Sequence, residues 1–149
     1  GSIGRVAVGV ASAQVVTTGL KFAVGRYRPN QSPDDHARFK PFSSHASFPS
    51  GHATTAFAMA SAISTEVGGG WVPFVTYPLA TLTAWSRVHD NQHWLSDVVA
   101  GGFIGHWVGR KVVQMQRDHA GLGAGGQAHR LDLELLESDT SLLAMRYTF

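Results

Sequence analysis

Four mostly apolar segments follow one another along the chain, and polar or glycine-rich stretches separate them. The first runs from Ile3 to about Tyr27, the second from His52 to Val67, the third from Trp71 to Val88 and the fourth from about His93 to Gln116. Each is long enough for several helical turns, and short links force neighbouring helices to run in opposite directions. We therefore predict an all-α fold, an antiparallel helical bundle of about four helices.

Glycine and proline predict where these helices stop. Pro29 should end the first helix at the residue before it, and the run Gly68-Gly69-Gly70 should end the second. Pro73 and Pro78 should delay the start of the third helix or kink it. The polar stretch 30–48 between the first two helices reads as one loop, and loops of that length inside compact domains tend to be functional or mobile.

Small residues recur at four-residue intervals in two of the segments, which predicts close contact between helices. They are Ala56, Ala60 and Ser64 in the second segment and Gly101, Gly105 and Gly109 in the fourth.

The length of 149 residues is enough for a real hydrophobic core. We assign residues 1–120 to the helical bundle and residues 121–149 to a flexible glycine-rich linker and tail, in which the segment from Arg130 could be a strand or disordered. The chain starts at Gly1-Ser2 without a methionine, so we expect that N-terminal helices of the natural protein could be missing.

Charge and composition exclude several classes of function. The net charge of +2 is small and dispersed, which argues against a nucleic-acid partner. The absence of cysteine excludes disulfides and thiolate metal sites. Eight histidines raise the possibility of a metal, but the sequence holds no HExxH motif and no closely spaced histidine pair.

The stretch 86–97 carries the clearest chemical signal. His93 and Asp97 are four residues apart and would lie on one face of a helix. A carboxylate that accepts one ring N–H of a histidine makes the other nitrogen a better base or nucleophile. Arg87, six residues earlier, could supply a guanidinium fork for a phosphate. Such a pair alone is more often structural, so further residues of the chain are needed to show whether it belongs to a catalytic site.

The predicted antiparallel order gathers further polar groups at the same end of the bundle. That end combines three cations, a helix N-terminus with free N–H groups, two histidines and one carboxylate. So much positive charge needs a bound anion, and guanidinium geometry favours a tetrahedral one, phosphate. The residues are Lys21, Arg28 and Arg87; Ser50 and Gly51; His52 and His93; and Asp97.

In order and spacing, these residues resemble the three-part signature of the type 2 phosphatidic acid phosphatase family. The superfamily includes bacterial class A acid phosphatases and vanadium haloperoxidases. The three blocks are K-x6-R-P (Lys21, Arg28, Pro29), P-S-G-H (Pro49 to His52) and S-R-x5-H-x3-D (Ser86, Arg87, His93, Asp97).

The resemblance implies a phosphatase that needs neither a metal nor another cofactor. It implies that His93 attacks phosphorus to form a phosphohistidine, that Asp97 orients the His93 ring and that His52 protonates the leaving group. Lys21, Arg28, Arg87, Ser50 and Gly51 would bind the phosphate oxygens. The substrate would be a phosphomonoester or diphosphate, with a lipid-linked one favoured: a phosphatidate, a phosphatidylglycerophosphate or an isoprenyl diphosphate.

Three alternatives stay open at this point. One is a broad-specificity periplasmic acid phosphatase, another a vanadium haloperoxidase, and the third a helical membrane module without enzymatic activity. The resemblance favours membrane association in a bacterial-type cell envelope, although the usual form in this family has six transmembrane helices and we find no clean run of twenty strongly apolar residues. The distal basic residues would place the active end on the extracytoplasmic side; they are Arg5, Arg110, Lys111 and Arg117. A soluble periplasmic protein is the alternative, and the oligomeric state is left open.

Overall fold

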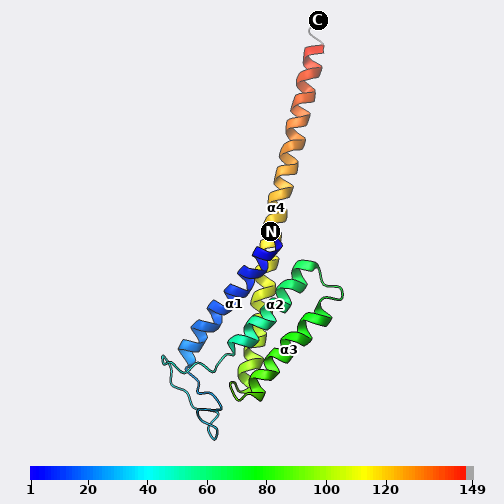
Figure 1. Cartoon of the computed structure of the whole chain (residues 1–149). Coiled ribbons are helices and arrows are strands. Elements are labelled where there is room, and N and C mark those ends of the chain that lie inside the picture. The colour runs from blue at the N-terminus through cyan, green and yellow to red at the C-terminus, as the bar shows by residue number, and fades with distance from the viewer. Residues whose placement is uncertain (147–149) are drawn as a thin grey trace. The chain divides into compact units, whose positions relative to one another are not determined.

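The computed structural model describes the backbone of residues 1–146 and the side chains of residues 1–121. Within the described backbone there are helices and no strand, which confirms the all-α prediction, and Figure 1 shows the helices of residues 1–114 packing into a bundle. They are α1 (Ser2–Val24), α2 (Gly51–Val67), α3 (Pro73–His89) and α4 (Leu95–Arg146). The chain divides into two compact units, Gly1–Gln114 and Met115–Phe149. The bundle and the candidate site lie in the first unit.

Helix α1 ends at Val24, about three residues before the predicted end. Gly25 adopts the left-handed conformation with φ 59° and donates its N–H to the Lys21 carbonyl, so a glycine cap and not Pro29 stops the helix. A Cβ at this position would also lie 1.8 Å from the Lys40 carbonyl oxygen. Arg28 therefore lies in the loop after α1 and not on the helix that carries Lys21.

The predicted limits of α2 and α3 are confirmed closely. The Ser50 hydroxyl accepts the Ala53 N–H at 3.4 Å and caps the start of α2, and Gly68 at φ 86° ends it. Pro73 is the first residue of α3, where its missing N–H costs nothing, and the helix continues past Pro78.

Helix α4 differs from the prediction at both ends. It begins at Leu95, after His93, and the Trp94 N–H donates to Asp97 Oδ2 at 2.9 Å in its first turn. It continues to Arg146, beyond the expected end near Gln116. Once a helix has nucleated, each further residue adds a hydrogen bond, and a glycine costs only about 1 kcal/mol relative to alanine. The side chains of the predicted tail from Arg130 lie outside the described residues.

The glycine stripe of α4 packs directly on the backbone of α2, as predicted. A Cβ at Gly105 would lie 2.2 Å from the Thr54 carbonyl oxygen, and one at Gly101 would lie 2.5 Å from that of Ser50. Only glycine allows this approach. It places the start of α4 against the start of α2, where the Ser50 N–H donates to the Asp97 carbonyl at 2.9 Å.

The loop 30–48 contains no helix or strand, as predicted, and backbone hydrogen bonds fix it to the end of α1. The Lys40 N–H donates to the Gly25 carbonyl at 2.8 Å, and the Ser47 N–H donates to the Arg26 carbonyl at 3.0 Å. The loop thereby brings Ser47 beside the polar end of the bundle.

Helix α1 is long and apolar enough to cross a membrane, with a mean hydropathy of 1.4 over its most apolar window. The helix is still not a clean run of twenty strongly apolar residues, as expected, because it includes Arg5, Gln14 and Lys21. Its Gly, Ser and Thr residues lower hydropathy far less than charges would, and charges occur only at Arg5 and Lys21. Large apolar side chains are also exposed on every helix of the bundle; examples are Val15, Met59, Phe74, Trp85, Val99 and Phe103.

Candidate functional site

A pocket of about 370 Å³ lies where the loop meets the starts of α2 and α4. It brings together five of the eight predicted site residues, from four separate parts of the chain. The five are Lys21, Arg28, Gly51, His52 and His93, and the remaining lining residues are Gln14, Ala46 and Thr55. The prediction that the motif residues gather at one end of the bundle is confirmed.

His93 forms part of the pocket wall, although its side chain is only 4% exposed. Its Nδ1 is buried and lies 3.6 Å from Asp97 Oδ2, longer than an ordinary hydrogen bond. No other partner of Nδ1 occurs among the described side chains. Nδ1 thus faces the carboxylate behind the ring, and Nε2 is the ring nitrogen left for the pocket.

Asp97 is fully buried and surrounded by donors. Burial would raise the pKa of its carboxyl group, but the neighbouring His93 ring, the Ser47 hydroxyl, the Trp94 N–H and the charge of Arg26 outweigh burial and lower it. The Ser47 hydroxyl donates to Oδ2 at 2.5 Å. Asp97 is therefore held as a carboxylate behind the His93 ring.

Arg26, which the sequence analysis missed, is the cation that neutralises Asp97. Its Nη1 lies 2.6 Å from Asp97 Oδ1 and 2.7 Å from the Ser96 hydroxyl, and its Nε and Nη2 donate to the His36 carbonyl. The guanidinium also lies over the rings of Phe39 and Trp94. The sequence offers no signal for this role, because an arginine just after a helix usually faces solvent near the negative end of the dipole.

The pocket's two cations are held by neutral acceptors. Lys21 Nζ donates to the Ala46 carbonyl at 2.6 Å, and Arg28 Nη1 donates to Gln92 Oε1 at 2.7 Å. Burial, and after it the positive charge of Arg28, lowers the pKa of Lys21 to about 8, so its ammonium group is still mostly protonated at neutral pH. Gln92 is a second residue that the sequence analysis missed.

The N-terminus of α2 forms one wall of the pocket through Gly51 and His52. The first N–H groups of a helix have no partner inside the helix and carry the positive end of its dipole. Ser50, predicted as a phosphate ligand, is buried beneath them as the helix cap and does not line the pocket.

The pKa of His52 is lowered. Burial is the main cause, and the positive charge of Arg87 is the next, followed by His93, Lys21 and Arg28. An anion bound among these cations would offset their effect on the His52 ring. The local charge is therefore favourable for a ligand that carries negative charge.

Arg87, another predicted site residue, does not line the pocket. Its Nη2 lies 3.0 Å from Asp90 Oδ2 and its Nε donates to the Ser86 hydroxyl at 3.2 Å. The structure places it near enough to act on His52 through its charge, but not in the pocket lining.

Gln14 completes the pocket from the middle of α1. Its Nε2 donates to the Gly51 carbonyl at 3.0 Å and to the Thr55 hydroxyl. A polar side chain inside an otherwise apolar helix was a signal for this role. In the part of the chain with described side chains, no group of three or more His, Asp or Glu side chains is arranged to hold a metal.

Comparison with known proteins finds a family and several relatives with similar sequences. The sequence profile of the PAP2 superfamily matches residues 3–120. A lipid A 1-phosphatase of Porphyromonas gingivalis is 34% identical over 105 residues, and one of Rhizobium etli is 40% identical over 92 residues. These alignments cover 69% and 59% of this chain.

The chain spans only 21% of the Porphyromonas protein and 39% of the Rhizobium etli protein. A further lipid A 1-phosphatase, from Rhizobium johnstonii, is 39% identical over 92 residues. No solved structure matches the chain significantly. Since the profile covers the whole bundle and its pocket, this chain belongs to the PAP2 superfamily.

Proposed function

We propose that this chain is a phosphatase that hydrolyses a phosphomonoester or diphosphate on a lipid, through a phosphohistidine and without a metal. The observation that carries the proposal is the single pocket in which Lys21, Arg28 and the start of α2 surround His93. Relatives named lipid A 1-phosphatase favour a lipid phosphate as the substrate class.

In the first step, His93 Nε2 attacks phosphorus while the bond from phosphorus to the lipid oxygen breaks. Asp97 stabilises the positive charge that develops on the ring, and Arg26 and Ser47 keep Asp97 ionised and in place. His52 gives its proton to the leaving oxygen, so a phosphomonoester releases an alcohol and a diphosphate releases a monophosphate.

In the second step, His52, now neutral, takes a proton from water as the water oxygen attacks phosphorus. The bond from phosphorus to His93 breaks, and inorganic phosphate and the free imidazole are formed. Lys21, Arg28 and the N–H of Gly51 stabilise the phosphate oxygens in both steps. Arg87 would also bind a phosphate oxygen, after its guanidinium group turns away from Asp90. Ser50 would contribute indirectly, because it caps α2 and thereby holds the helix N-terminus that binds the phosphate.

We also propose that the bundle is associated with a membrane, with its polar end at the extracytoplasmic surface. Support comes from the apolar length of α1 and from the apolar side chains exposed on every helix of the bundle. Arg110 and Lys111, far along α4 from the pocket, suit the cytoplasmic side.

The test is phosphate release by wild type and His93→Ala from phosphatidate, phosphatidylglycerophosphate, lipid A, an isoprenyl diphosphate and a small soluble ester. We expect release from a lipid that requires His93, survives EDTA and is inhibited by vanadate. Equal release from the soluble ester would indicate a broad acid phosphatase. No release from any of them, or release restored only by a divalent ion, would contradict the proposal.

A further inference from the structure

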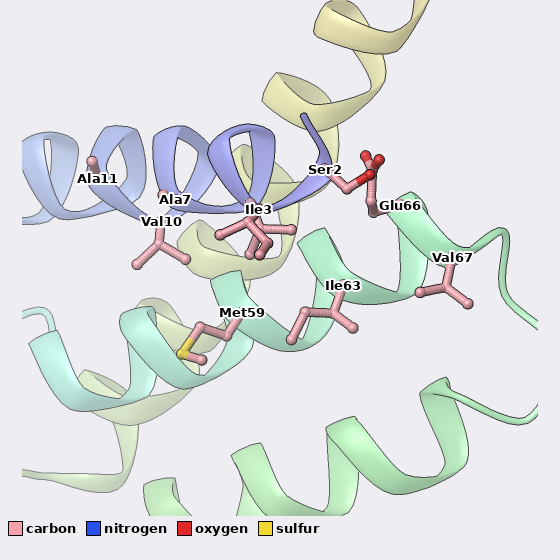
Figure 2. Close-up of a pocket in the computed structure, with 10 residues that line it drawn as sticks. Ser2, Ile3, Ala7, Val10, Ala11, Met59, Ile63, Glu66 and Val67 are labelled. Atoms are coloured by element: carbon pink, nitrogen blue, oxygen red, sulfur yellow. The ribbon is translucent and has the colours of Figure 1, made fainter.

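An apolar groove between α1 and α2 is a feature of the bundle that the proposed reaction does not use. Its volume is about 630 Å³, within the usual range for ligand pockets of about 300–1,000 Å³. Figure 2 shows Ile3, Ala7 and Val10 of α1 facing Met59 and Ile63 of α2 across it.

The groove continues the phosphate pocket along the same two helices. On α2, Thr55 lines the phosphate pocket, and Met59, one turn further on, lines the groove. On α1, Gln14 lines the pocket, and Ala11, just under one turn away, lines the groove. The two sites are therefore adjacent along α1 and α2, as a molecule with a charged head and an apolar chain would require.

An ion pair limits the groove at its far end. Arg5 Nε donates to Glu66 Oε2 at 3.0 Å, and Glu66, whose side chain is 10% exposed, lines the groove. From Met59 to Val67, the first and last groove residues on α2, the helix rises about 12 Å. The acyl region of one membrane leaflet is about 15 Å deep, half of a hydrocarbon core of about 30 Å. The groove thus spans most of the depth that an acyl chain occupies in one leaflet.

We propose that the groove binds an acyl chain of the phosphorylated lipid substrate while its phosphate lies in the cationic pocket. The inference rests on the proposed function and adds to it a binding site for the chain. It requires the head of the lipid at the Gln14 end of the groove and the chain's methyl end near the Arg5 to Glu66 pair.

The test compares dipalmitoyl and dihexanoyl phosphatidate as substrates of wild type, Ala11→Trp and Val8→Trp. Ala11 lines the groove, whereas Val8 is exposed on α1 outside it and serves as the matched control. Loss of contact with two or more methylene groups corresponds to about tenfold. We expect the kcat/KM ratio of the long to the short substrate to fall about tenfold in Ala11→Trp and to stay at the wild-type value in Val8→Trp.

The outcomes separate the groove from the reaction. If wild type releases phosphate from neither phosphatidate, long-chain and short-chain forms of whichever panel lipid it does hydrolyse replace them, and release from none of the panel substrates would contradict the proposed function itself. If all three proteins release phosphate with the same ratio of kcat/KM for the long to the short substrate, the proposal that the groove binds an acyl chain is wrong. The proposed function would not be affected by that result.

A second measurement does not depend on the Ala11→Trp variant or on turnover. A phosphatidate with a diazirine at the end of one acyl chain should label peptides that contain Met59 or Ile63, in wild type and in His93→Ala. Labelling confined to α3 or α4, as expected if another helix or a second copy covers the groove, would overturn the proposal.

Discussion

Arg26 and Asp97, 71 positions apart in the chain, form a buried ion pair in which Nη1 lies 2.6 Å from Oδ1. The pair joins the segment after α1 to the first turn of α4. Because Asp97 also stands behind the His93 ring, this contact couples the stability of the bundle to the orientation of the proposed nucleophile.

Replacing Arg26 with methionine should destabilise the bundle strongly. The change leaves the Asp97 carboxylate buried without its cation, and breaking one side of a buried pair costs about 3–5 kcal/mol. Denaturant unfolding in detergent measures the loss. The matched control is Arg38→Met, which removes an exposed guanidinium 4.5 Å from the Tyr27 ring and should cost about 1 kcal/mol or less. Equal losses in both variants would contradict the importance of the buried pair.

The lowered pKa of Asp97 predicts a loss of stability in acid. Since the folded pKa lies below the ordinary 3.8, the carboxylate stabilises the fold above that pH, and the contribution disappears as pH falls through the folded value. The difference in unfolding free energy between wild type and Asp97→Asn should be constant near neutral pH and should narrow below about pH 4. Asp34→Asn, which changes an exposed loop carboxylate, should follow the wild-type curve. If the difference in unfolding free energy between wild type and Asp97→Asn stays constant down to strongly acidic pH, the prediction is wrong.

The contact between α2 and α4 predicts a penalty for any side chain at Gly105. A Cβ there would lie 2.2 Å from the Thr54 carbonyl oxygen, so the helices must separate, at a cost of about 1–3 kcal/mol. Gly19→Ala is the control, because its Cβ would meet nothing within 4 Å and should raise stability by up to about 1 kcal/mol. Thermal unfolding distinguishes the two, and a stable Gly105→Ala variant would show that the helices are not in such close contact.

The helices and the pocket could be predicted from the sequence because both depend on local patterns. Apolar runs, prolines and glycines locate the helices, and short links bring distant motif residues to one end. His93 lies before α4 and not on it, so the predicted start of this helix was wrong. The His93 ring nevertheless lies beside Asp97, as predicted.

The partners of the motif residues could not be predicted in this way. Arg26 meets Asp97, and Gln14 meets Gly51, only after the loop and helices have packed. The spacing of residues along the chain does not predict such contacts. The predicted end of α1 was wrong for a related reason. Gly25 ends the helix at the point where the Lys40 backbone packs against it, and this contact joins two separate segments of the chain.

His52 should matter most for substrates with poor leaving groups. If it protonates the leaving oxygen, His52→Ala should lower kcat/KM for an alkyl phosphate by about 10²-fold to 10⁴-fold and much less for p-nitrophenyl phosphate, whose leaving group needs no proton. His93→Ala should abolish turnover of both. Steady-state rates on the two esters give the comparison, and equal losses with both esters in His52→Ala would argue against its role as the acid.

Arg87 should control the protonation of His52, although it does not line the pocket. After burial, its positive charge is the largest influence that lowers the pKa of His52 below 6.5. Replacing Arg87 with glutamine removes that charge, so the pKa of His52 should rise and the ring should stay protonated to higher pH. NMR titration of the His52 ring protons measures the shift in the absence of substrate. Arg38→Gln, in the exposed loop, is the control and should leave the titration unchanged. An unchanged pKa in Arg87→Gln would mean that the guanidinium lies too far from His52 to act on it, and a place for Arg87 around the bound phosphate would then lose its support.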